Sequence, residues 1–421
     1  MKKNGFIMST YVYILLVFFL LLLGTMLVVL NNTRLLANKI KENTDGNIDF
    51  NLVLKGDKEI ILKKDSEYIE PGYIATTFDG KILDVNVMGE VNVNKLGEYD
   101  IMYIAEYKGV EKKIRRKVIV AENLVTYITN LYEDSITRAS NNLKKDNTPD
   151  QNIRYYGSDP NNYVRFNNEL WRIIGVFGNN VKLVRSEKLG ELSWDSSASS
   201  VNNGRGVNEW SQSDLKNYLN TMYYGGTSVT CYNGKYDQTT TCPTNRLDET
   251  SKSLMDNHIW NTGAIEYKTK TDTLAFYNAE RGNETGKICS GGNKCNDTVE
   301  RTTSWTGYVG LPYVTDWAYA SSESICETNM QKQDSSNAYI CKNNNWMHWM
   351  QRSVWTWYLS PLASDSLAES VWYVVGDGRA GNRYAADSLA VAPSIYLKSD
   401  VSVVFGNGTS DDPYKLWLSE N

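Results

Sequence analysis

Residues that could catalyse a reaction or bind a metal are few in this chain. It has two histidines, His258 and His348, and neither stands near a Ser, Cys or metal-ligand pattern of the kind used in nucleophilic catalysis. With 49 Asp and Glu residues, some pair will always lie at glycosidase distance, so such a pair indicates nothing. No phosphate-binding loop or dinucleotide fingerprint is present. The sequence predicts a protein that is not an enzyme and needs no cofactor.

The two histidines have simpler structural explanations. His258 lies at the end of the stretch 250–260, which has helical spacing, so we expect it to cap or pack against a helix end. His348 lies within "NWMHWMQRSVWTW", where we expect it to belong to an aromatic wall.

The six cysteines all lie late in the chain, in segments rich in Gly, Asn and Thr. Their even number and short spacings predict disulfides formed in an oxidising compartment. Zinc ligation is disfavoured, because the spacings and the lone histidines do not suit tetrahedral coordination; six reduced cysteines in a cytosolic domain are the alternative. Sequence alone leaves the connectivity open, and we favour pairing of neighbours: Cys231 with Cys242, Cys289 with Cys295, and Cys326 with Cys341.

The segment Trp355–Leu397 mixes aromatic, charged and small polar residues. Such mixtures are typical of adaptable binding surfaces, and Trp or Tyr rings suit stacking on sugars. The alternative is a β-hairpin surface with turns around Gly376, Gly378 and Gly381. Asp377 and Asp387 with nearby carbonyl groups would be the ligands of a calcium ion, although no spaced calcium motif is present. The candidate ligand-binding residues are Trp355, Trp357, Asp365, Trp372, Asp377, Arg379, Asn382, Arg383, Tyr384 and Asp387.

A membrane anchor is predicted at the start of the chain, because residues 4–33 carry no charge. The core of this stretch, Tyr11–Leu30, would span roughly 30 Å as a helix, which matches the hydrocarbon thickness of a bilayer. We expect residues 7–30 to contact membrane lipid in a single pass. Flanking charges are nearly balanced, so the predicted disulfides decide the orientation and place the later domains outside the cell.

An alternative exists for this N-terminus. A short basic start, Gly5-Phe6 and a long apolar helix resemble a type IV prepilin leader, which is cleaved after the glycine. The family usually has a glutamate at the fifth mature position, where this chain has Thr10. A pilin-like subunit displaying its C-terminal part on a fibre is therefore the second hypothesis, and cleavage after Gly5 would favour it.

The next segment has the pattern of a small β-sandwich, with short runs rich in Ile, Val, Tyr and Thr between Gly, Asp or Asn turns. The stretch Leu54–Val120 contains "EPG" at 70–72 and "LGEY" at 96–99. It resembles the bacterial Ig-like domain repeated in Gram-positive surface proteins. The resemblance implies a stalk rather than a ligand-binding domain.

Helical spacing returns at Leu124–Lys145 and stops before Pro149, which predicts a helical connector. Beyond it, "YVRFNNELWRIIGVFGNNVKLVRSE" predicts antiparallel strands with a turn at Gly178-Asn179. "WSQSDLKNYLNTMYY" predicts a short helix with Ser211 as N-cap. We expect a second helix at 250–260, followed by a loop-rich region to Tyr358.

This last part carries a second resemblance. The blocks "YVRFNNELWRIIGV", "WSQSDLKNYLN", "WYLSP" and "VAPSIYL" resemble a secreted bacterial family of uncharacterised function, which we associate with the C-type-lectin-like fold of formylglycine-generating-enzyme-like domains. Ala392 stands where that family usually has an arginine before the proline. We carry over no reactive cysteine. The resemblance to retroelement-diversified proteins also suggests that residues 360–390 are a diversified recognition patch.

The predicted fold class is multidomain: an N-terminal transmembrane helix, an all-β Ig-like sandwich and an α+β C-type-lectin-like C-terminal domain. The predicted boundaries are 1–44 for the anchor and helical neck, 48–122 for the Ig-like domain, 123–150 for the connector and 151–421 for the last domain. A net charge of −5 and a pI near 5.4 give no attraction to nucleic acid. We expect an adhesin-like cell-surface protein whose last domain binds an extracellular glycan or protein.

Overall fold

The computed structural model describes residues 49–266, 272–282, 302–330, 340–349, 355–363, 368–376, 378 and 380–418, together with Phe19, Thr25 and Met26. The chain divides into two compact units. The first comprises Met1–Val93 and Glu98–Ile119, and the second comprises Asn94–Gly97 and Val120–Asn421. Apart from Phe19, Thr25 and Met26, the predicted anchor and the prepilin-like start lie outside the described residues. Within these residues, no helix has the length and apolar character needed to span a membrane.

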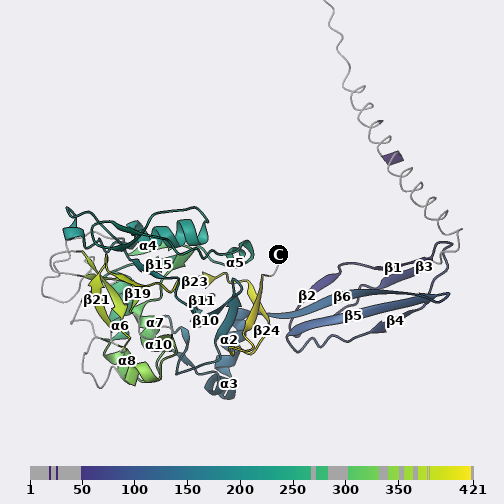
Figure 1. The fold of residues 1–421 in the computed structure, drawn as a ribbon. Helices are drawn as coiled ribbons and strands as arrows, with labels where there is room; N and C mark the ends of the chain where they lie inside the picture. The colour runs from purple at the N-terminus through teal and green to yellow at the C-terminus, as the bar shows by residue number, and fades with distance from the viewer. Residues whose placement is uncertain are drawn as a thin grey trace, which may run out of the picture. The chain divides into compact units, whose positions relative to one another are not determined.

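The first unit is built from strands, of which β1 pairs antiparallel with β3 and β4 pairs antiparallel with β5 (Figure 1). One sheet pairs β1 with β3, and in the other β5 lies between β4 and β6, with β2 on the far side of β6. Lys108 and Gly109 both have positive φ and form the two-residue turn between β5 and β6 that such a hairpin requires. The strands are β1 (Phe50–Leu54), β2 (Glu59–Lys63), β3 (Tyr73–Thr77), β4 (Val85–Met88), β5 (Gly97–Tyr107) and β6 (Val110–Asn123).

The "EPG" motif of this unit holds a buried arginine of β6. The Arg116 side chain is fully buried, and its guanidinium donates to Glu70 Oε1 and to the Asp57 carbonyl (3.1 Å). The same Glu70 oxygen accepts from the Gly72 amide (2.8 Å). Burial raises the pKa of Glu70, but the hydrogen bonds from Tyr68 and the Gly72 amide and the charge of Arg116 outweigh it and hold the pKa below the usual value. The motif therefore stabilises the sandwich.

Glu70→Ala is expected to lower the free energy of unfolding of the first unit by about 2 kcal/mol, because it leaves the buried Arg116 without its charged acceptor. Hydrogen exchange of peptides from β5 and β6 in the full chain would measure this loss. Asp100→Ala is the matched control, since Asp100 pairs with Arg115 at 3.2 Å in an exposed position and should cost about 1 kcal/mol or less. Equal effects of the two substitutions would contradict this role of Glu70.

The second unit mixes sheets with short helices (Figure 1). The helical segments are α2 (Leu124–Glu133), α3 (Ser135–Ser140), η1 (Asn202–Gly204), η2 (Trp210–Gln212), α4 (Asp214–Asn217), η3 (Tyr218–Tyr224), α5 (Glu249–Ser253), α6 (Thr273–Glu280), α7 (Val314–Tyr319), α8 (Ile325–Thr328) and α10 (Trp346–Trp349). The strands of its first half are β7 (Leu143–Lys145), β8 (Ile153–Tyr155), β9 (Tyr163–Phe166), β10 (Glu169–Phe177), β11 (Asn180–Arg185), β12 (Glu191–Ser193), β13 (Cys231–Gly234) and β14 (Gln238–Thr240). Those of its second half are β15 (His258–Asn261), β16 (Ile265–Glu266), β17 (Ser304–Gly307), β18 (Val309–Gly310), β19 (Thr356–Ala363), β20 (Ser370–Val374), β21 (Ala380–Tyr384), β22 (Ser388–Ala390), β23 (Ser394–Leu397), β24 (Val401–Phe405) and β25 (Tyr414–Leu418).

The larger sheet of this unit follows the order β18-β23-β11-β10-β9-β25-β24. The predicted hairpin is confirmed, since β10 pairs antiparallel with both β9 and β11. Gly178, with φ of 58°, lies in the predicted turn.

The second sheet has the order β12-β22-β19-β20-β21, with β16 paired to β19. Every residue of β19 and β20 is buried. Successive side chains point to opposite faces of a strand, so Trp357 and Tyr373 enter one core while Tyr358 and Trp372 enter another. Ala392 also lies in this other core, at 4% exposure.

Three local predictions differ from the structure. The connector helix ends at Glu133, because Asp134 is extended and caps a new helix, α3. The helix at 214–217 is capped by Ser213 rather than Ser211, since Ser213 Oγ accepts from the Lys216 amide at 3.2 Å. The predicted helix at 250–260 is wrong in its second half, where β15 pairs with β17.

Four charged side chains are buried together between the larger sheet and α7. Arg154 donates to Asp146 Oδ2 (2.9 Å) and to Asp316 Oδ1 (2.5 Å), and Lys182 Nζ donates to Asp316 Oδ2 (2.6 Å). Burial lowers the pKa of Lys182 to about 8, although Asp316 opposes the shift. Opposite charges thus compensate one another in the interior.

Candidate functional site

The predicted ligand-binding residues separate into a buried and an exposed group. Trp357 and Trp372 are fully buried. The Trp357 indole N–H donates to the Leu192 carbonyl (2.9 Å), and that of Trp372 donates to the Ile265 carbonyl (3.4 Å). Both rings are parts of the core that a surface ligand does not reach, so the structure does not place them on the predicted binding surface.

Trp355 is the exposed aromatic residue of this segment. It is 40% exposed, and the Arg383 guanidinium lies over its ring at 4.1 Å. The Tyr373 ring lies 5.5 Å away, tilted by 54°. A cation stacked on an indole holds the ring in a defined orientation, so Trp355 presents a preoriented ring at the surface.

A second aromatic residue, Tyr384, is flanked by two cations. Arg205 lies over its ring at 4.4 Å and Lys235 at 4.8 Å. Arg205 also pairs with Glu369 at 3.0 Å. The sequence pattern of the C-terminal segment did not indicate Arg205 and Lys235, because they come from loops more than a hundred residues earlier in the chain.

Asp387 interacts electrostatically with a cation from each aromatic group: Arg383, which lies on Trp355, and Lys235, which lies on Tyr384. Its carboxylate lies 4.0 Å from Arg383. Burial raises the pKa of Asp387, and the charges of Arg383 and Lys235 act in the opposite direction. Asn382 is half-buried on β21 and faces Trp372 in the register with β20.

We call the group Trp355, Arg383, Tyr384, Asp387, Arg205 and Lys235 the β21 edge. In the described part of the chain, β21 is the outer strand of its sheet. The antiparallel pairing of β20 and β21 confirms the predicted hairpin, and Gly376 and Gly378 lie in the connection between the two strands, but Gly381 lies within β21 and not in a turn. Asp365, Asp377 and Arg379 lie outside the described residues. The β21 edge therefore brings together four of the predicted residues, namely Trp355, Arg383, Tyr384 and Asp387.

The described residues show no group of three or more His, Cys, Asp and Glu side chains arranged to hold a metal ion. The calcium prediction depended on Asp377 and so lies partly outside these residues. His258 begins a strand rather than ending a helix, and its ring stacks on Tyr396 at 3.6 Å. Burial lowers the pKa of His258, although Asp256, 2.9 Å from Nδ1, opposes the shift.

A cavity of about 600 Å³ lies elsewhere in the second unit. Its wall includes Ser158, Asp159, Tyr163, Lys342, His348 and Ser410. No sequence pattern indicated this cavity, because its residues come from three separate parts of the chain.

One side of this cavity is organised by a buried arginine. Arg172 pairs with Asp159 at 3.2 Å and donates to the Tyr163 hydroxyl at 3.1 Å. Its guanidinium also lies over the Tyr163 ring at 3.9 Å. Burial disfavours the charged form of both side chains: it lowers the pKa of Arg172 and raises the pKa of Tyr163.

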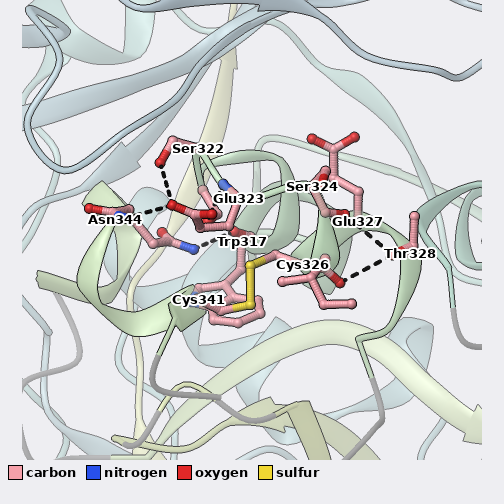
Figure 2. The surroundings of a disulfide bond; sticks show 12 residues. Trp317, Ser322, Glu323, Ser324, Cys326, Glu327, Thr328, Cys341 and Asn344 are labelled. Atoms are coloured by element: carbon pink, nitrogen blue, oxygen red, sulfur yellow. Dashed lines mark hydrogen bonds between the residues drawn. A yellow bond between two sulfur atoms is a disulfide. The ribbon is translucent and has the colours of Figure 1, made fainter. Parts of the chain in front are cut away.

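The other side of the cavity is formed by residues 342–348, which come directly after the disulfide-bonded Cys341. Cys326 and Cys341 are bonded, as are Cys231 and Cys242, which confirms two predicted pairs; Cys289 and Cys295 lie outside the described residues. Figure 2 shows the Cys326–Cys341 bond beside Trp317, and the Asn344 amide that donates to Glu323 at 2.8 Å. The Asn345 amide donates to the Trp317 carbonyl at 2.7 Å. These contacts hold the segment that carries Lys342 and His348.

Comparison with known proteins identifies the class of the first unit. The model of the Ig-like domain of bacterial surface proteins matches residues 52–120. The chain is a bacterial cell-surface protein with an Ig-like domain, and the two disulfides are consistent with an extracellular location.

One solved structure, that of a lipoprotein from Bacteroides thetaiotaomicron, is similar at 24% sequence identity with a TM-score of 0.17. The similarity covers 34% of this chain and 62% of that chain, which is less than two thirds of its length. No curated protein matches this chain significantly.

Proposed function

We propose that the second unit is the binding head of an adhesin-like surface protein, and that it holds an extracellular glycan or protein ligand at the β21 edge. The observation that carries the proposal is the exposed Trp355 ring with Arg383 stacked on it at 4.1 Å. Rigid aromatic and arginine side chains are the groups that most often dominate binding energies. Binding here uses stacking, charge and hydrogen bonds, without covalent chemistry.

In this proposal, the rest of the chain holds the binding head outside the cell. The Ig-like domain is a stalk, and residues 7–30 anchor the protein in the membrane by a single pass. The head has a C-type-lectin-like fold. The proposal includes no enzymatic step, cofactor or nucleic-acid partner.

The test is a screen of the full chain, purified in mild detergent, on glycan and host-surface-protein arrays. We expect saturable binding to at least one ligand class, and an about tenfold weaker affinity for Arg383→Ala, which corresponds to about 1.4 kcal/mol. Arg115→Ala is the matched control, because its side chain is exposed and lies in the first unit. A folded chain that binds nothing, or that binds equally well after Arg383→Ala, would refute the proposal. A parallel screen with a chelator reports on calcium.

A further inference from the structure

We infer that the cavity beside the Cys326–Cys341 disulfide is a second ligand site, and that it takes a sugar unit bearing a carboxylate group. The inference does not rest on the proposed function, because the cavity and the β21 edge share no residue. Each site is tested by its own variants.

The size of the cavity suits a small ligand. Its volume of about 600 Å³ lies within the range of roughly 300–1,000 Å³ that is typical of small-molecule sites. A monosaccharide or disaccharide unit fits into such a volume.

The wall of the cavity offers the groups that a polyhydroxylated ligand needs. Ser158, Ser410 and Asn343 supply hydroxyl and amide groups that both donate and accept hydrogen bonds. Tyr163 adds an aromatic surface. Small numbers of convergent polar groups beside an aromatic side chain fix the orientation of a ligand.

The charges of the wall favour an anion. Asp159 already pairs with Arg172, so its negative charge is compensated within the protein. Lys342 has no ion pair with another described residue, and it contributes a positive charge to the wall. A carboxylate on the sugar would form a charge-assisted hydrogen bond with Lys342.

The segment that carries Lys342 is held by contacts within the second unit. The Cys326–Cys341 disulfide fixes its start, and the Asn345 side chain fixes the next turn by accepting from the Met347 amide (3.0 Å) and the His348 amide (3.3 Å). A preorganised wall reduces the ordering cost of binding.

The experiment is a calorimetric titration of the full chain with glucuronic acid, using glucose as the neutral analogue. We expect saturable binding of glucuronic acid, at least tenfold tighter than that of glucose. Lys342→Ala should abolish this preference and Lys342→Arg should retain it. Lys188→Ala is the matched control, because this exposed lysine pairs with Glu191 on the surface.

Two further variants separate this site from the β21 edge and from general unfolding. Trp355→Ala should leave glucuronic acid binding unchanged. The double variant Cys326→Ser/Cys341→Ser should weaken it, with tryptophan fluorescence showing whether the unit is still folded. The inference is overturned if glucuronic acid does not bind, if glucose binds equally well, or if folded Lys342→Ala keeps the preference.

Discussion

Asp316→Ala is expected to lower the free energy of unfolding of the second unit by about 4 kcal/mol, in the range measured for breaking buried ion pairs. The reason is the number of charges that this carboxylate compensates. It accepts from Arg154 and from Lys182, both buried, and its second oxygen also accepts from the Tyr313 amide at 2.9 Å at the start of α7. Removing it leaves the buried Lys182 and the Tyr313 amide without their acceptor, and leaves Arg154 with Asp146 alone.

Urea unfolding of the full chain, followed by tryptophan fluorescence, would measure this loss. All 12 tryptophans lie at or after Trp171, so the signal reports on the second unit alone. Lys182→Met is the matched comparison: it removes one cation but leaves Asp316 paired with Arg154, so its cost should be clearly smaller. A fully folded Asp316→Ala variant within about 1 kcal/mol of the parent would show that the buried network contributes little to stability.

Trp357→Ala is the second large effect, with an expected loss of about 4 kcal/mol in unfolding free energy, typical of emptying a buried aromatic site. The Trp357 ring is completely enclosed by the core, and its N–H group is bonded to the Leu192 carbonyl. Trp355→Ala, two residues earlier, should change stability by less than about 1 kcal/mol, because its ring lies at the surface. The same unfolding experiment compares the two variants. A reversed order would mean that the two rings have been assigned to the wrong environments.

This pair of tryptophans also shows what the sequence could and could not reveal. Composition marked the segment Trp355–Leu397 as unusual, and the hairpin of β20 and β21 followed from its glycines. Composition could not distinguish Trp357 from Trp355, because β19 is buried on both faces and its residues therefore lack the polar–apolar alternation that would mark one face as exposed.

Long-range contacts were the other limit. Strand pairing of neighbours, as in β9, β10 and β11, and disulfides between neighbouring cysteines follow from local spacing. Arg205 reaches Tyr384, and Tyr163 meets Lys342 at the cavity, only through the tertiary fold. No local sequence pattern predicts such contacts between residues that are far apart in the chain.

The Ig-like segment was the most predictable part, since its turn residues have direct structural reasons. Glu70 of the "EPG" motif binds the buried Arg116, and Gly72 takes a positive φ of 94°. By contrast, Ser211 and Ser213 both precede the same helix. Either serine could serve as its cap by residue type, so the sequence could not decide between them.

The most direct test of the binding head compares two exposed aromatic residues of the second unit. Trp355 and Phe405 have similar exposures, 40% and 37%, and each has a cation on its ring, Arg383 and Lys415. Affinities of the full chain for the ligand found on the arrays would be measured for Trp355→Ala and Phe405→Ala. Binding at the β21 edge predicts at least a tenfold loss for Trp355→Ala and no change for Phe405→Ala. Equal affinities of the two variants would contradict it.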